Sequence, residues 1–115
     1  MKRIVFAAAA AVALLVAGPA SAHTALVSSN IEAGRTYAEA PRAIELVFSA
    51  AVGLAEAKLA LEGKEVPIDY AYPDEMRTDF RIPLPELASG RYTFAWRVMS
   101  KDGHAMTGEL AFAVK

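Results

Sequence analysis

The sequence predicts an all-β domain, a sandwich or Greek-key barrel of about seven short strands. Three observations lead to this prediction. After residue 22, apolar and polar residues alternate in several runs, which is the period of a half-buried strand. Gly, Pro and Ser interrupt these runs at short intervals, as in small antiparallel domains. The number and spacing of the runs are those of a sandwich or barrel.

The first 22 residues have the pattern of a secretory signal peptide. A basic start, Lys2-Arg3, precedes the apolar run IVFAAAAAVALLV, and the small residues Ala20-Ser21-Ala22 follow a Gly-Pro breaker. The apolar run is shorter than the roughly 18 to 20 residues that a membrane span needs. We therefore expect cleavage after Ala22, with an uncleaved N-terminal anchor as the alternative. The mature domain would cover residues 23–115, start with His23 and have no membrane span.

Composition limits what this mature domain can be. Removal of 22 of the 115 residues leaves 93, enough for one domain with a modest core. Two basic residues are lost, so 12 − 2 = 10 Lys and Arg stand against 13 Asp and Glu, a net charge of about −3. We expect no nucleic-acid partner, because phosphate binding needs clustered basic residues. The absence of cysteine excludes disulfides and thiolate metal sites.

In the first half of the mature chain, the runs predict strands over 25–28, 42–50 and 56–63. A helix over 50–61 is the alternative, because Ala and Glu are good helix formers. The third run ends at Gly63-Lys64, a turn signal. The apolar residues that share a face are Ile44, Leu46 and Phe48 in the second run and Leu59 and Leu61 in the third.

In the second half, strands are predicted over 65–68, 77–84, 91–100 and 109–114. Pro67 places the first of these at a sheet edge, because proline cannot donate to the ladder. The 91–100 run alternates most regularly and is the expected central core strand. Its aromatic face fits core packing better than a ligand platform. The apolar residues in phase are Phe80 and Ile82, then Tyr92, Phe94, Trp96 and Val98, then Leu110, Phe112 and Val114.

Cleavage would give His23 an unusual metal-binding capacity. At a free N-terminus, the α-amine and the imidazole Nδ1 of one histidine can bind the same ion and close a chelate ring. The amine has a pKa of about 8, so a metal can displace its proton at neutral pH. An internal histidine lacks this second donor.

The second candidate group is Asp102-Gly103-His104. In an extended segment, this spacing projects the carboxylate and the imidazole to the same side. With the amine and imidazole of His23, the donors form an N₃O set, which suits tetragonal copper(II); zinc would use the same atoms in a tetrahedral arrangement. Taken singly, each histidine fits a surface residue and Asp-Gly a common turn. Taken together, both histidines of the mature chain lie at chelating positions.

Two long stretches of the mature chain resemble the periplasmic copper-resistance protein C family, CopC. They are HTALVSSNIEAGRTYAEAPRAIELVFS and SGRYTFAWRVMSKDGHAMTGELAFAV, which together span most of the mature residues. The most specific elements are the mature N-terminal His23 with Leu26, then Pro41 and its following strand, then Tyr92, Trp96, Ser100, Asp102, Gly103, His104 and Gly108.

The resemblance implies a seven-stranded Greek-key β-sandwich of cupredoxin-like shape that binds one copper(II) ion per chain in the periplasm. It carries the ligand roles onto His23, by amine and imidazole, onto Asp102 and onto His104. The implied partners are copper and either an inner-membrane, CopD-like copper importer or another copper carrier. No catalytic residue is implied.

The chain departs from the family pattern at several positions. Asn30-Ile31 stands where Pro-Ala is frequent, Ala105 where Pro often follows the motif histidine, and Ala50 where an acidic residue is common. Some family members also hold copper(I) in a methionine-rich loop, since thioethers are soft ligands. The methionines after the signal form no Met-x-Met cluster, so a copper(I) site is not predicted; they are Met76, Met99 and Met106.

The leading functional hypothesis is a copper(II) protein for sequestration, resistance or delivery. One alternative is an oxidative enzyme built on a histidine brace, which also starts with a copper-binding histidine. Its predicted signature is peroxide-dependent oxidation of a polysaccharide. The other alternative is a metal-free immunoglobulin-like interaction module, whose melting temperature copper would not raise.

Overall fold

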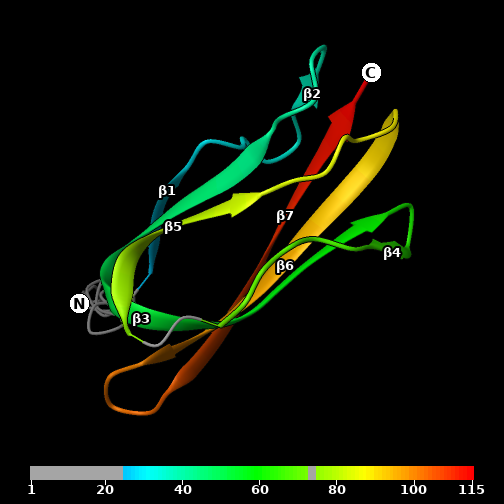
Figure 1. Cartoon of the computed structure of the whole chain (residues 1–115). Coiled ribbons are helices and arrows are strands. Elements are labelled where there is room, and N and C mark those ends of the chain that lie inside the picture. Colours follow the sequence, from blue (N-terminus) through cyan, green and yellow to red (C-terminus); the bar gives the residue numbers. More distant parts are fainter. Residues whose placement is uncertain (1–24, 73–74) are drawn as a thin grey trace, which may run out of the picture.

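β3 (Ala43–Leu61) is the longest strand of a curled seven-stranded sheet and takes part in both of its halves (Figure 1). The computed structural model describes residues 25–72 and 75–115. These residues contain no helix, and therefore none that could cross a membrane. The other strands are β1 (Leu26–Ser29), β2 (Thr36–Tyr37), β4 (Lys64–Val66), β5 (Arg77–Pro83), β6 (Gly90–Ser100) and β7 (Ala105–Val114).

Different strands occupy the two edges of β3. Its first half pairs with β1 and β5, and its second half pairs with β6 and β4, all antiparallel. Val52 pairs with both Ser100 of β6 and Arg77 of β5, so β6 and β5 lie on opposite edges. β1 and β5 pair with the same part of β3, so they too must lie on opposite edges of it. β1 therefore lies on the same edge of β3 as β6. β7 continues the sheet beyond β6, and β2 pairs with β7 in parallel.

The core confirms the predicted alternation. Along β6 every second side chain is buried, and the same period holds along β5 and the second half of β7. Full burial of such a side chain contributes about 1.5 to 3 kcal/mol. Of the predicted apolar residues, Leu61 is only partly buried. The buried ones are Ile44, Leu46, Phe48, Leu59, Phe80, Ile82, Tyr92, Phe94, Trp96, Val98, Leu110, Phe112 and Val114, and Ile31, Ala43, Val52 and Leu54 are buried with them.

The prediction divides β3 wrongly. Two strands over 42–50 and 56–63 are expected, with a helix over 50–61 as the alternative, but the structure has one strand through both. Residues 52–61 pair with β6, interrupted only by a bulge between Leu54 and Glu56. This pairing supplies the backbone hydrogen bonds that a helix would otherwise make, and so tertiary structure overrides helix propensity.

Turn chemistry explains the end of β3. Leu61 pairs with Lys64, and the two residues between them both have positive φ, 49° at Glu62 and 88° at Gly63. This is the two-residue hairpin turn whose twist matches that of the strands, and glycine favours it. The two-residue β2 was not predicted, because it is too short to show a period. The all-β class and the number of strands are nevertheless confirmed.

Candidate metal centre

The hairpin loop between β6 and β7 is closed by its own backbone. The amide of Gly103 donates to the carbonyl of Ser100 at 3.0 Å, and the amide of Ser100 donates to the carbonyl of His104 at 2.8 Å. Gly103 has φ +91°, a conformation that side-chain-bearing residues rarely adopt. The chain therefore reverses its direction within four residues, and the positive φ of Gly103 makes this reversal possible.

This turn brings Asp102 and His104 together. Oδ2 of Asp102 lies 3.0 Å from Nδ1 of His104, and the backbone amide of His104 donates to Oδ1 of Asp102 at 3.3 Å. The side chains are 68% and 71% exposed, so an ion can reach both from solvent. A turn over residues 101–103, and not strand alternation, produces the juxtaposition.

The hydroxyl of Ser100 also contacts this pair. It donates a short hydrogen bond to Oδ1 of Asp102 and lies 3.2 Å from the carbonyl oxygen of His104. The sequence resemblance includes Ser100 but assigns it no role. The signal that could have revealed one is the spacing Ser-x-Asp in a turn, where hydroxyls and carboxylates bond locally.

These contacts keep the carboxylate of Asp102 ionised. The hydrogen bond from Ser100, followed by those from the side chain and backbone of His104, lowers the pKa of Asp102 to about 2. Each bond stabilises the charged form of the carboxyl group. At neutral pH the loop therefore presents an anionic oxygen beside an imidazole.

The donor atoms of Asp102 and His104 fit a metal ion. Oδ2 of Asp102 and Nδ1 of His104 share a hydrogen bond at 3.0 Å, and a metal ion that binds both atoms would displace the proton between them. Imidazole and carboxylate are ligands for copper(II) and zinc. Among residues 25–72 and 75–115, however, no group of three or more His, Asp or Glu side chains could hold an ion. Further ligands are therefore required.

The start of β1 lies at the same end of the sheet. Ala25 exchanges two hydrogen bonds with Ser49 of β3, one to its hydroxyl and one from its amide, both 2.9 Å. On the same edge of β3, Ser100 pairs with Val52. Ser49 and Val52 are three residues apart along β3, which corresponds to a separation of about 10 Å. His23, the third predicted ligand, lies outside the described residues.

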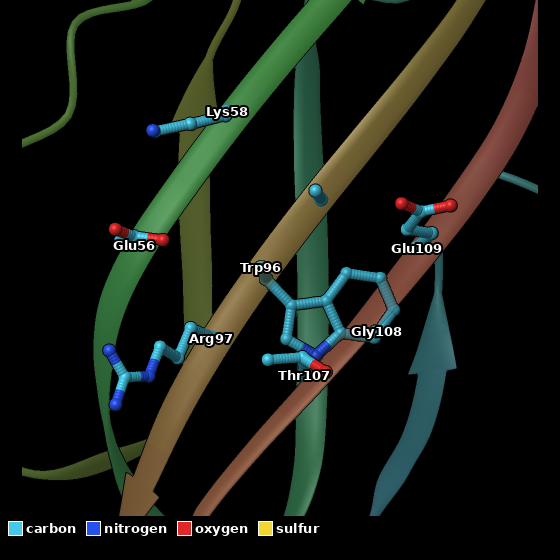
Figure 2. A pocket seen from close by; sticks show the side chains of 8 residues that line it. Glu56, Lys58, Trp96, Arg97, Thr107, Gly108 and Glu109 are labelled. Atoms are coloured by element: carbon cyan, nitrogen blue, oxygen red, sulfur yellow. The ribbon is translucent and has the colours of Figure 1, made fainter.

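Trp96 belongs to the core and not to the candidate centre. It is 9% exposed, stacks with Phe94 at 6.0 Å between ring centroids, and lies against Gly108 of β7. Figure 2 shows Trp96 extending from β6 towards Gly108. The pocket drawn there, of about 290 Å³, is lined by Glu56, Lys58, Ala95, Trp96, Arg97, Thr107, Gly108 and Glu109 and includes neither Asp102 nor His104.

Comparison with known proteins identifies the family. Residues 26–115 match the family described as the CopC domain. The chain belongs to the CopC family. This confirms the resemblance found in the sequence, and the match includes the β6–β7 loop as well as the complete described sheet.

Two CopC relatives have similar sequences along most of their length. Copper resistance protein C of Pseudomonas syringae pv. tomato is 34% identical over 125 residues, covering 100% of this chain and 98% of that protein. Copper resistance protein C of Escherichia coli is 34% identical over 111 residues, covering 87% of each.

Two solved CopC structures have the same fold. CopC from Methylosinus trichosporium OB3b superposes with a TM-score of 0.65 at 30% identity, covering 81% of this chain and 94% of the other. PcoC, a methionine-rich copper resistance protein from Escherichia coli, superposes with a TM-score of 0.67 at 31% identity, covering 82% of this chain and 100% of the other.

Proposed function

We propose that this CopC-family protein binds one copper(II) ion per chain at the β6–β7 loop. The observation that carries the proposal is the exposed pair of Asp102 and His104, with donor atoms 3.0 Å apart. An ionised carboxylate beside an imidazole suits a divalent ion, and copper(II) heads the affinity order for such ligands. The names of the relatives, copper resistance protein C, support copper over zinc as the ion.

The remaining ligands are assigned to His23. Cleavage of the signal peptide after Ala22 would free its α-amine, which together with its imidazole supplies two donors. The path of β1 supports this assignment, because β1 and β6 share an edge of β3 and Ala25 bonds to Ser49 there. His23 precedes Ala25 by two positions in the sequence, and an extended chain spans up to about 7 Å over two residues.

The physiological role is handling of the ion in the periplasm. Three residues would supply four donors, which fills a tetragonal plane and leaves no plane position for a substrate. The protein would therefore sequester copper(II), or deliver it to a CopD-like inner-membrane importer or another carrier. We expect no catalytic activity.

The test is a copper(II) titration of two purified forms, one starting at His23 and one with a single alanine added before it. Both retain every side chain, but the added residue converts the α-amine into an amide. Tight one-to-one binding, with a nitrogen-rich tetragonal electron paramagnetic resonance (EPR) spectrum in the first form alone, supports the proposal. Equally weak binding by both forms contradicts it and favours the metal-free interaction module.

A further inference from the structure

The two carboxylate oxygens of Asp102 have different hydrogen-bond partners in the β6–β7 loop. Oδ1 accepts hydrogen bonds from the Ser100 hydroxyl and the backbone amide of His104, whereas the partner of Oδ2 is the side-chain Nδ1 of His104, at 3.0 Å. Oδ1 is therefore held by groups that are not proposed ligands, and Oδ2 is the oxygen that shares a hydrogen bond with the proposed ligand His104. The hydrogen bonds to Oδ1 therefore set the orientation of the carboxylate.

The Ser100 side chain can hold that orientation because its own backbone is fixed. It is the last residue of β6, its amide donates to the carbonyl of His104 at 2.8 Å, and its carbonyl accepts from Gly103 at 3.0 Å. An O–H···O⁻ hydrogen bond is charge-assisted and stronger than a neutral one. The side chains of Asp102 and His104 have no comparable support from burial, since both are largely exposed.

We propose that Ser100 is a positioning residue for the metal centre: its hydroxyl holds Oδ1 of Asp102, so that Asp102 offers copper a single oxygen, Oδ2, next to His104. The inference rests on the proposed copper function and adds a residue outside the ligand set. Ser100 touches the ligand and not the ion. It acts by fixing the carboxylate before the ion arrives, which lowers the ordering cost of binding.

The variant Ser100→Ala removes the hydroxyl and leaves both backbone hydrogen bonds of the residue in place. Loss of an outer-shell partner typically weakens metal binding about 10- to 100-fold. We expect a loss of that size in copper(II) affinity, measured by chelator competition on the chain starting at His23. We also expect altered EPR hyperfine parameters, because a freed carboxylate can rotate or bind through both oxygens.

Two matched variants separate positioning from stability. Ser100→Thr keeps a hydroxyl at the same place and should restore both the affinity and the spectrum. Ser89→Ala makes the same substitution beside the opposite end of β6, where the exposed Ser89 side chain makes no hydrogen bond with any described residue. It should bind copper like the unaltered protein. The metal-free melting temperatures of Ser100→Ala and Ser89→Ala should be close.

Three outcomes would contradict either the positioning role of Ser100 or the proposed copper function. If Ser100→Ala binds copper with unchanged affinity and spectrum, the positioning role is wrong while the copper function stands. If Ser100→Thr loses affinity as much as Ser100→Ala, and both melt well below Ser89→Ala, the residue is merely structural. If the unaltered chain starting at His23 shows no tight site, the copper function itself fails.

Discussion

Oδ2 of Asp102 lies 3.0 Å from Nδ1 of His104 because the chain turns through Gly103, at φ +91°, between them. The two donors therefore belong to one loop rather than to two separate elements. A loop that aligns its donors in advance loses less conformational entropy when an ion binds. The first two predictions concern this relationship.

The substitution Asp102→Asn should weaken copper(II) binding by at least about 100-fold, more than loss of a supporting residue, because it removes the anionic oxygen. The measurement is chelator competition with the chain that starts at His23. Asp69→Asn is the control, since Asp69 is exposed in the segment between β4 and β5 and its replacement changes net charge equally. Equal affinities for the two variants would exclude Asp102 as a ligand.

Without copper, the folded protein should resist acid partly through Asp102. Its pKa falls from 3.8 to about 2, first through the hydrogen bond from Ser100 and then through those from His104. A lowered pKa stabilises the folded state above the unfolded pKa, and this contribution is lost as pH falls from about 4 towards 2. Carboxyl NMR titration should give a higher Asp102 pKa in Ser100→Ala. An unchanged pKa would show that the hydroxyl does not act on this carboxylate.

The substitution Gly108→Ala should destabilise the protein by about 1 to 3 kcal/mol through overpacking. A Cβ at this position would overlap with Cζ2 of Trp96, so the indole or the strand must move. Urea unfolding measures the cost, and the fluorescence of Trp96, the only tryptophan, reports the displacement. The neighbouring exposed position supplies the control Thr107→Ala, which should change stability by less than about 0.5 kcal/mol. Equal stabilities would contradict the close packing.

Tyr70 should stabilise the loop between β4 and β5 up to alkaline pH. Its hydroxyl donates to the carbonyl of Leu54 at 2.5 Å, and burial is the main cause that raises its pKa to about 12. A raised pKa means that this stabilisation is complete below pH 10 and lost as pH rises towards 12. Tyr70→Phe should therefore cost about 1 kcal/mol at pH 7.

Urea unfolding at pH 7 and pH 11.5 checks this prediction, because the difference between the native chain and Tyr70→Phe should shrink at the higher pH. Tyr72→Phe is the matched control: Tyr72 is 60% exposed, and its hydroxyl lies over Gly53. The prediction is wrong if both variants unfold alike at pH 7.

Much of the fold could be predicted because its strands bury one face. The alternation in β6 and the end of β7 identifies the buried side chains directly, and the structure confirms them. The local pattern was insufficient for β3, where residues 50–61 are compatible with helix or strand. The ladder with β6 decides for a strand, and the partners in that ladder are distant in sequence.

The candidate centre was predictable in its chemistry but not in its geometry. Asp102 and His104 are identified by residue type and spacing alone. The distance between their side chains is set by the tight turn through Gly103, whose detailed geometry the spacing does not specify. The contact from Ser100 could not be predicted, because it depends on the orientation of one hydroxyl and one carboxylate.

The sequence by itself determined the all-β class, the buried face of the main strands, and the presence of a carboxylate and an imidazole two residues apart. Periodicity and residue chemistry are local properties of the sequence, so they can be recognised without knowledge of tertiary contacts. Only the tertiary structure decided that the start of β1 and the end of β6 lie along the same edge of β3, beside Ser49 and Val52. Ala25 and Ser100 are far apart along the chain, and strand pairing, which no local pattern specifies, sets the distance between them.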